Sequence, residues 1–378
     1  MRRLFYGNFD FEHELANPNG WQRPPAIRRL LAERASVWIA LANDGDLIWT
    51  PEEIPDSFWE EFAANGLPRV RGVTDIDALS HDNIELVPWG WSRRMLSLSQ
   101  RPIPQNEAAA HVGNSRKWSF ALEQELGVVL PGAARIDRLE DSSPTVTTSA
   151  SRYGERPTDH RWVIKSNFGM AARERILGLG PTLSDSHHHW IQRRLAADRA
   201  VFFEPWIPIR EEVGLQFTIP PLTAGSPRLE GVTPLLSDTQ GGYAGSHFSL
   251  DEVVPKTWQS SVDFALQAAE RLQQLGYVGP LGIDAAQHEL PSGDVVVRQL
   301  QDINVRFTMG RLALGFKQLL RRSEYGVWQH RATKEVSNPP APSNAPIRII
   351  RTSPLVVNST PTKHCSEVLI FAGDLGER

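Results

Sequence analysis

Apolar residues recur with the spacing of amphipathic helices in several parts of the chain. In residues 257–275, Trp258, Val262 and Ala269 belong to one apolar stripe, and Gly276 supplies the stop. The same criteria predict further helices at 24–34, 56–65, 114–127 and 185–200. Asn114 is the expected N-cap of the helix at 114–127 because its side chain can accept a hydrogen bond from the first turn.

Short apolar runs between these helices predict strands. Runs at 2–6, 37–41, 47–50 and 84–88 alternate with helices, which is typical of an α/β unit over roughly the first hundred residues. Later strands are expected at 161–166, 200–203, 281–289, 295–307, 347–351 and 367–371. Residues 141–160 are rich in Ser, Thr and Pro and are expected to form a loop, and residues 333–346, with four prolines, a linker.

The composition narrows the class of protein. The 378 residues are 40% hydrophobic and 22% charged, close to ordinary globular usage, so wholesale disorder is not expected. Forty basic and forty-four acidic side chains give no electrostatic reason to bind nucleic acid or anionic lipid. No apolar run reaches the roughly 18 residues that a membrane helix needs, and the first 15 residues lack a signal peptide's apolar core. A single cysteine, Cys365, excludes an internal disulfide, so we expect a cytoplasmic protein.

Familiar catalytic motifs are absent. The sequence contains no Walker-type phosphate loop, GxGxxG, HExxH or GxSxG. Three adjacent histidines at 187–189 resemble a metal site, but neighbouring helical residues point about 100° apart, so we interpret them as a polar helix start.

Polar residues on one face of a predicted strand suggest phosphate chemistry. Successive strand side chains alternate between faces, so Asp302, Asn304 and Arg306 share one side. Oxygen ligands suit Mg²⁺, and a neighbouring guanidinium can hold phosphate oxygens. A three-residue turn at 292–294 places Asp284 opposite Asp302, whereas a two-residue turn places them on opposite faces. Facing carboxylates repel unless a metal bridges them or they share a proton.

The order of these segments resembles the ATP-grasp superfamily, which includes biotin carboxylase, D-alanine–D-alanine ligase and glutathione synthetase. The resemblance spans roughly residues 106–325. It rests on five segments in the family's order: NSRKWSFALEQELG, WVIKSNFG, FFEPWIPI, GIDAA and DINVRFTMG. This chain departs from the family in having Asp284 and Asp302 where glutamates are usual, and only Gly169 in the glycine loop.

The resemblance implies a role for each matching residue. Lys165 contacts the α- or β-phosphate, with Lys117, or less favourably Arg116, as the second cation. The lid loop over the phosphates consists of Phe168, Gly169, Met170 and Ala171. Glu204 lies near the adenine amino group, and the hinge of Pro205, Trp206 and Ile207 bonds the ring through its backbone. Either Glu211 or Glu212 reaches the ribose. The metal, Mg²⁺ or alternatively Mn²⁺, is held by Asp284, Asp302 and Asn304, and Arg306 faces the transferring phosphoryl group.

We therefore expect an α/β (α+β) ATP-grasp fold with an N-terminal α/β domain. The expected parts are 1–105, the N-terminal domain; 106–206, the lid; 207–330, the metal-binding half; and 331–378, a proline-rich linker with a short β-like extension. In this superfamily the first part often helps to bind the acceptor substrate. The polar, aromatic segment 6–15 is a candidate for that pocket, with a packing role as the alternative.

The reaction implied is ATP- and Mg²⁺-dependent ligation of a carboxylate to an amine or thiol through an acyl phosphate. The substrates are small molecules or peptides, with no nucleic acid and no membrane involved, and a homodimer is left open. Two alternatives remain: an ATP-grasp kinase, and a nucleotide-binding protein that has lost its chemistry.

Overall fold

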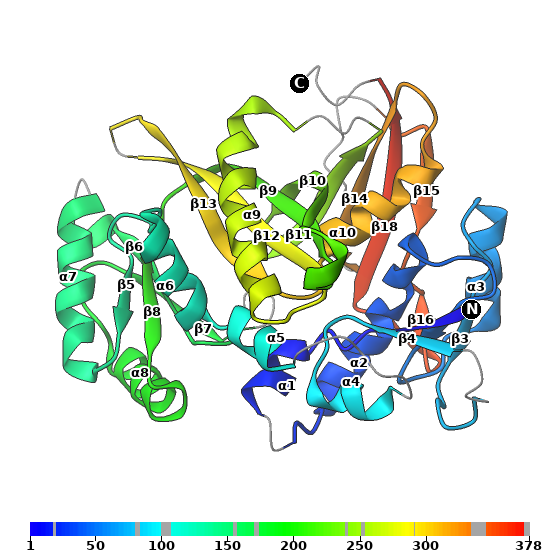
Figure 1. Ribbon diagram of the computed structural model, residues 1–378, viewed down its shortest axis with the longest axis horizontal. Helices are drawn as coiled ribbons and strands as arrows, with labels where there is room; N and C mark the ends of the chain where they lie inside the picture. Colours follow the sequence, from blue (N-terminus) through cyan, green and yellow to red (C-terminus); the bar gives the residue numbers. More distant parts are fainter. Residues whose placement is uncertain are drawn as a thin grey trace.

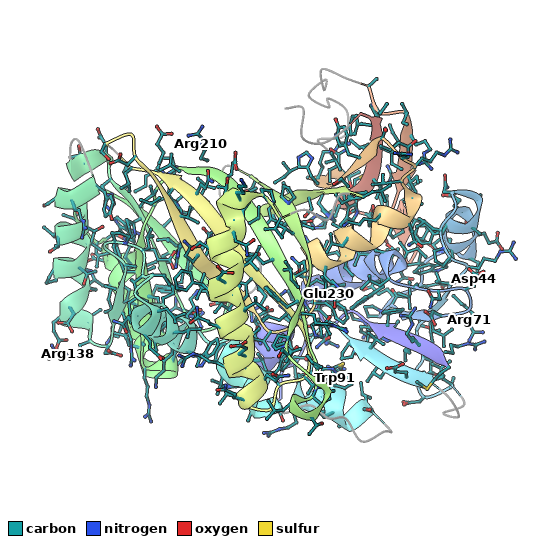
Figure 2. The ribbon with its side chains drawn as sticks, turned by 45° about the horizontal axis from the view of Figure 1, so that its top comes forward. Asp44, Arg71, Trp91, Arg138, Arg210 and Glu230 are labelled. Carbon is teal, nitrogen blue, oxygen red and sulfur yellow. The ribbon has the colours of Figure 1, made fainter. Side chains whose placement is uncertain are left out.

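A computed structural model describes residues 1–17, 20–79, 84–99, 107–153, 157–169, 174–238, 241–250, 254–290, 292–333 and 345–373. Figure 1 shows three parts: a small sheet with its own helices at the left, a large central sheet crossed by one long helix, and an N-terminal unit at the lower right. No helix among the described residues is long and apolar enough to cross a membrane. Charged side chains such as Arg138 and Arg210 lie at the periphery (Figure 2).

The N-terminal unit is the predicted α/β arrangement. Its parallel strands are β1 (Arg2–Tyr6), β2 (Leu47–Trp49), β3 (Arg71–Val73) and β4 (Ile84–Pro88), in the order β3-β2-β1-β4. Its helices are α1 (Phe11–Ala16), α2 (Pro25–Arg34), α3 (Asp56–Ala64) and α4 (Arg93–Leu98). The strand expected at 37–41 is wrong, since a buried 3₁₀ helix, η1 (Ala35–Ala40), continues α2 there. Periodicity cannot distinguish a short, wholly buried strand from a buried helical turn.

The part expected to be the lid, called the lid below, has a separate antiparallel sheet and its own core. Its strands are β5 (Ala134–Ile136), β6 (Arg161–Lys165), β7 (Arg175–Leu179) and β8 (Val201–Pro205), in the order β5-β8-β6-β7. Its helices are α5 (Glu107–Gly113), α6 (Arg116–Leu126), α7 (Ser142–Tyr153) and α8 (Asp185–Asp198), with η2 (Leu139–Asp141) and η3 (Pro157–Asp159). The core includes Trp162, Phe203 and Val146.

Three expectations for the lid can be compared with this structure. The loop expected over 141–160 is wrong for α7, whose buried Val146, Ser149 and Ala150 recur at helical spacing among weakly hydrophobic neighbours. The N-cap of α6 is Ser115, whose Oγ accepts from Trp118 N at 3.2 Å, and not Asn114. The polar start of α8 is confirmed, because His187 and Ser184 form a capping box.

The central sheet consists of eight antiparallel strands in the order β13-β12-β9-β10-β11-β14-β18-β15. They are β9 (Ile209–Ile219), β10 (Arg228–Ser237), β11 (Tyr243–Ser249), β12 (Gly279–Glu289), β13 (Val295–Asn304), β14 (Glu324–Ala332), β15 (Arg348–Arg351) and β18 (His364–Ala372). The helices on it are α9 (Gln259–Gln274) and α10 (Met309–Gly315), with η4 (Leu222–Ala224), η5 (Lys256–Trp258) and η6 (Phe316–Leu319). β16 (Val356–Val357) and β17 (Thr360–Pro361) form a small hairpin.

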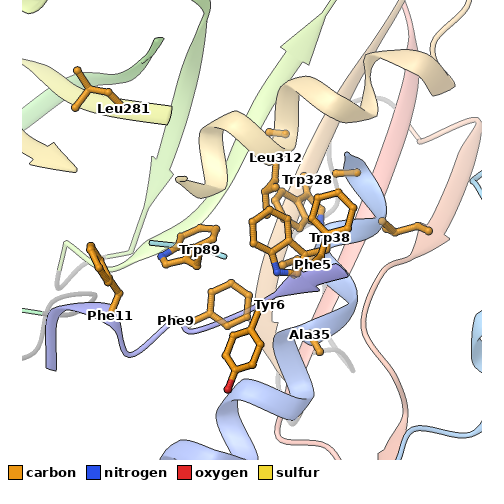
Figure 3. Close-up of a cluster of buried hydrophobic side chains, with 14 of the residues drawn as sticks. Phe5, Tyr6, Phe9, Phe11, Ala35, Trp38, Trp89, Leu281, Leu312 and Trp328 are labelled. Carbon is orange, nitrogen blue, oxygen red and sulfur yellow. The ribbon is translucent and has the colours of Figure 1, made fainter. Parts of the chain in front are cut away.

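The C-terminal residues belong to this sheet. β18 pairs with β14 along its whole length and β15 pairs with β18, so the boundary expected at residue 330 falls inside β14. Figure 3 shows how the N-terminal unit packs here: Phe5 and Trp38 lie against Trp328 of β14, with ring centroids of Phe5 and Trp38 5.0 Å apart. One continuous core therefore joins the N-terminal unit to the central sheet, while the lid core is separate.

The β12–β13 hairpin has the register predicted at its inner end. Asp284 pairs with Asp302, and Gly282 pairs with Asn304. The turn itself lies one residue earlier than expected, since Leu290 N donates to Asp294 O at 2.8 Å. A β-bulge between Asp284 and Ala286 then shifts the partner by two positions, which keeps both carboxylates on one face.

Candidate functional site

A cavity of about 470 Å³ lies where the lid, the central sheet and the N-terminal unit meet. Its walls include Lys165 and Glu204 from the lid, Asp284 and Asn304 from the central sheet, and Glu12 from the N-terminal unit. Its volume is in the range that holds a cofactor or a drug-sized ligand. The cavity therefore brings together polar residues from three distant parts of the chain.

At the lid side, an ion-pair network surrounds Glu204. Its carboxylate accepts from Lys165 Nζ at 2.6 Å and from both terminal nitrogens of Arg298 at 2.9 and 3.0 Å. Burial alone would raise the pKa of Glu204, but the charges of Arg298 and Lys165 hold it well below its usual value. Burial lowers the pKa of Lys165. Glu204 thus fixes the position of Lys165, and both of its carboxylate oxygens accept hydrogen bonds from cations.

Glu123 of α6 completes this network. Its Oε1 lies 3.5 Å from Arg298 Nη2, and its side chain is only 4% exposed. Burial raises the pKa of Glu123 to about 7, despite the opposing charge of Arg298. Four charged side chains from α6, β6, β8 and β13 therefore tie the lid to the central sheet.

Next along the cavity is a group of carboxylates. Asp284 lies opposite Asp302, and Asn304 Nδ2 donates to Asp284 Oδ2 at 3.4 Å. Glu212 accepts from Ser237 Oγ and Gln301 Nε2, both at 2.5 Å. Burial, followed by the charges of Asp302 and Glu212, raises the pKa of Asp284 well above its usual value. A bound cation would relieve this repulsion.

The donor set suits Mg²⁺ without forming a complete cage. Among the described residues, no three His, Cys, Asp or Glu side chains are grouped closely enough to hold a metal by themselves. Mg²⁺ is usually bound by one or two carboxylates together with waters and substrate phosphates. The pair of Asp284 and Asp302 fits that pattern, whereas the amide oxygen of Asn304 accepts a hydrogen bond from Arg306 Nη2 and its nitrogen faces Asp284.

Arg306 lies beyond the carboxylates, towards the N-terminal unit. Its Nε donates to Glu12 Oε1 at 2.5 Å, and Nη2 donates to Asn304 Oδ1 at 2.8 Å. Its guanidinium carbon lies 5.3 Å from the ring centroid of Trp89. β13 ends at Asn304 and not at the expected residue 307, so Arg306 is placed beside Asn304 by this hydrogen bond and not by strand alternation.

The two candidate second cations differ in position. Arg116 lines the cavity, with Nη2 3.8 Å from Asp302 Oδ1, whereas Lys117 is exposed and is not among the lining residues. The first position of α6 thus faces the cavity, and the second faces solvent. The position of Arg116 therefore favours it over Lys117, which the prediction preferred.

Other expected residues can be placed in the same way. Gly169 lines the cavity, while Phe168 is buried against His111, with ring centroids 4.9 Å apart. The hinge residues Pro205, Trp206 and Ile207 all line it. Glu212 lines it and Glu211 is exposed, because they are adjacent on β9 and point to opposite faces. Met170 and Ala171 lie outside the described residues.

Sequence reasoning missed several charged residues of this site, including Arg298 and Arg34. Arg298 is four residues before Asp302 on the same predicted strand, so its side chain is expected on the same face. The alternation used for Asp302 could therefore have identified Arg298 as well. Glu12 lies in the segment 6–15, of which Phe9 and Glu12 line the cavity and Phe11 and Leu15 lie in the core.

Comparison with solved structures finds similar folds among ATP-grasp enzymes. The ADP complex of purK, an N5-carboxyaminoimidazole ribonucleotide synthetase, matches over 98% of this chain and 92% of its own, with a TM-score of 0.54 and 10% identity. A biotin carboxylase from Campylobacter jejuni in a β,γ-ATP complex matches over 99% and 88%, with a TM-score of 0.53 and 9% identity. A phosphoribosylamine–glycine ligase from Thermotoga maritima matches over 100% and 94%, with a TM-score of 0.52 and 11% identity.

No protein-family model matches the sequence, and a search of curated proteins finds no similar one. The likeness to solved structures extends over nearly the whole chain and includes the N-terminal unit and the C-terminal strands. The chain therefore has the ATP-grasp fold that its five ordered segments predicted.

Proposed function

We propose that this protein is an ATP- and Mg²⁺-dependent ligase that joins a carboxylate to an amine. The observation that carries the proposal is a single cavity holding Lys165, the facing pair Asp284 and Asp302, and Arg306. The fold adds support, since the purK structure is an ADP complex and the biotin carboxylase structure is a β,γ-ATP complex.

In this proposal the nucleotide lies along the cavity from the hinge to Arg306. The adenine binds at Pro205 and Ile207 and the ribose at Glu212. Lys165, aligned by Glu204, and Arg116 contact the phosphates. Mg²⁺, held by Asp284 and Asp302, would supply charge neutralisation for the phosphates when bound. All of these residues line the one cavity, which supports the proposal.

The chemistry requires two steps. A carboxylate oxygen of the substrate attacks the γ-phosphorus, the bond from that phosphorus to the bridging oxygen breaks, and ADP leaves with the electron pair. An acyl phosphate remains. An amine or thiol then attacks the acyl carbon, loses a proton, and displaces inorganic phosphate. Arg306 contributes charge stabilisation as the phosphoryl group moves, and most of the rate comes from positioning.

A hydroxylamine trap tests this function without knowledge of the amine. The protein is incubated with Mg·ATP, a panel of carboxylic acids and hydroxylamine, and ADP and hydroxamates are measured. We expect ADP and hydroxamate in equal amounts with at least one acid. ADP with a stable phosphoester would instead identify a kinase, and the absence of ADP with every acid would contradict the ligase.

A further inference from the structure

The part of the cavity that faces the N-terminal unit has its own set of residues. We call it the acceptor end and define it by Phe9, Glu12, Arg34, Trp89, Tyr243 and His330, all of which line the cavity. These residues come from the N-terminal unit, β11 and β14, and the hinge contributes none of them. In the proposed function the nucleotide does not occupy the acceptor end, which is therefore available to a second substrate.

One corner of the acceptor end combines a cation with two neutral polar groups. The charge of Arg34 acts on both Tyr243 and His330, whose ring centroids are 5.3 Å apart. Burial lowers the pKa of His330 well below its usual value, so this ring is neutral at pH 7. Arg34 is therefore the cation of this corner, and Asp284 and His364 are the other ionisable groups that act on Tyr243 and His330.

The two neutral groups are held in place by second contacts. Tyr243 Oη lies 2.8 Å from Ser246 Oγ, and His330 Nδ1 lies 2.7 Å from Ser366 Oγ. Nε2 of His330 is buried and has no hydrogen-bond partner among the described residues. Buried polar atoms are normally hydrogen-bonded, so this nitrogen is available to a ligand in the cavity. A ligand oxygen near Tyr243 and His330 is consistent with this arrangement.

Arg34 lies at the end of a helix that is held in place by hydrogen bonds. It is the last residue of α2, and its neighbour Glu33 is buried. Glu33 Oε1 accepts from Arg29 Nε at 2.9 Å, and its carboxylate also accepts from Lys363 N at 3.2 Å. The end of α2 is thus fixed to the chain near β18. A guanidinium on a fixed backbone loses little freedom when it binds a planar anion.

The corner is also close to the proposed phosphoryl-transfer centre. Tyr243 lines the same cavity as Asp284 of the metal-binding strand. Glu12, the carboxylate of this end, is already bound to Arg306. Phe9 and Trp89 pack edge to face with centroids 4.9 Å apart and supply apolar wall.

We propose that Arg34, with Tyr243 and His330 beside it, binds the carboxylate that is phosphorylated, and that Phe9 and Trp89 bind an apolar or aromatic body. The acceptor is accordingly a small carboxylic acid with an apolar or aromatic group. This inference rests on the proposed function, of which it specifies the substrate class. Guanidinium pairs with carboxylates through two parallel hydrogen bonds, and aromatic walls bind apolar surface.

Thermal unfolding with bound Mg·ADP tests this proposal. The probes are benzoate, phenylacetate and 3-phenylpropionate, each paired with its neutral amide. We expect at least one acid to raise the Tm of the wild type above its value in Mg·ADP, and its amide to have no effect. Arg34→Gln should require about tenfold more acid or more, because a charge-assisted contact is lost. Arg28→Gln, which removes an exposed charge from the same helix, should behave as the wild type.

Tyr243→Phe provides a second variant if Arg34→Gln unfolds, and it should weaken the response to the acid while keeping the ring. The proposal is overturned if no acid raises the Tm, if the amides act equally, or if both variants keep the full response. Mg·ADP alone serves as a separate readout of the proposed function. If Mg·ADP has no effect on the wild type, the ligase fails, and titration with acid alone still decides whether Arg34 binds a carboxylate.

Discussion

Arg306 Nε lies 2.5 Å from Glu12 Oε1 and so joins the loop after β13 to helix α1 of the N-terminal unit. Both side chains are largely buried, with 13% and 6% of their surfaces exposed. The N-terminal unit therefore positions the guanidinium that is proposed to face the phosphoryl group.

Glu12→Gln should destabilise the fold. Removing one charge of a buried pair leaves the other uncompensated, which commonly costs about 3 kcal/mol. Urea unfolding of the variant should show this loss, and Glu60→Gln, on the exposed face of α3, should change stability by less than about 0.5 kcal/mol. In an Arg306→Gln background the same Glu12 substitution should have a much smaller effect. Equal losses in both backgrounds would show that the pair does not act as a unit.

Arg306→Lys should lower turnover far more than nucleotide affinity. A planar guanidinium can hold two phosphoryl oxygens at once, whereas lysine offers one point charge. Losing one such contact in the transition state commonly costs about 3 kcal/mol, or roughly a hundredfold in rate. ADP formation in the hydroxylamine assay and calorimetric affinity for ADP provide the two measurements. Parallel losses in both would make Arg306 an ordinary binding residue.

Arg116 and Lys117 offer a matched pair of neighbouring cations. Arg116→Gln should weaken Mg·ADP binding by about tenfold or more, since the contact removed is charge-assisted. Lys117→Gln should leave the affinity unchanged because Lys117 is exposed and lies outside the cavity. Calorimetric titration of the two variants distinguishes them, and the opposite result would restore the sequence-based preference for Lys117.

Glu123 should make stability depend on pH. Burial raises its pKa from 4.5 to about 7 in the folded protein, so folding favours the protonated form. The contribution of this group to the free energy of unfolding is fully present below about pH 4.5 and is lost as the pH rises through 7. The loss amounts to about 3 kcal/mol. Glu123→Gln stays neutral, so it should match the wild type at low pH and exceed it at pH 8. A difference in unfolding free energy that does not vary with pH would contradict this.

The order of helices and strands was predictable because the spacing of apolar residues can be read from the sequence without knowledge of tertiary contacts. Helix α9 and strands β12 and β13 follow from apolar spacing. The pairing of Asp284 with Asp302 was predicted from a three-residue turn, and it is present although the turn differs, because a β-bulge shifts the register. Helix α7 was not predictable from composition, because its Ser and Thr residues have low helix propensity and the helix depends on packing Val146 and Ala150 against the lid.

The roles of the cations depend on tertiary contacts that no local pattern carries. Whether Arg116 or Lys117 faces the cavity depends on where α6 begins, and its N-cap is Ser115, one residue after the expected Asn114. The ion pair between Glu204 and Arg298 joins two residues that are 94 positions apart in sequence. Sequence reasoning could name the types of residue required but not these partners.

The central claim is that this cavity binds a nucleotide through Mg²⁺ and Lys165. Calorimetric titration of ADP into the wild type and Lys165→Ala, with and without Mg²⁺, tests it most directly. The account predicts that ADP binds the wild type tightly only with Mg²⁺, and that Lys165→Ala weakens this binding by about tenfold or more while the protein stays folded, because Arg298 still pairs with Glu204. Binding that is independent of Mg²⁺, or equally tight in Lys165→Ala, would contradict it.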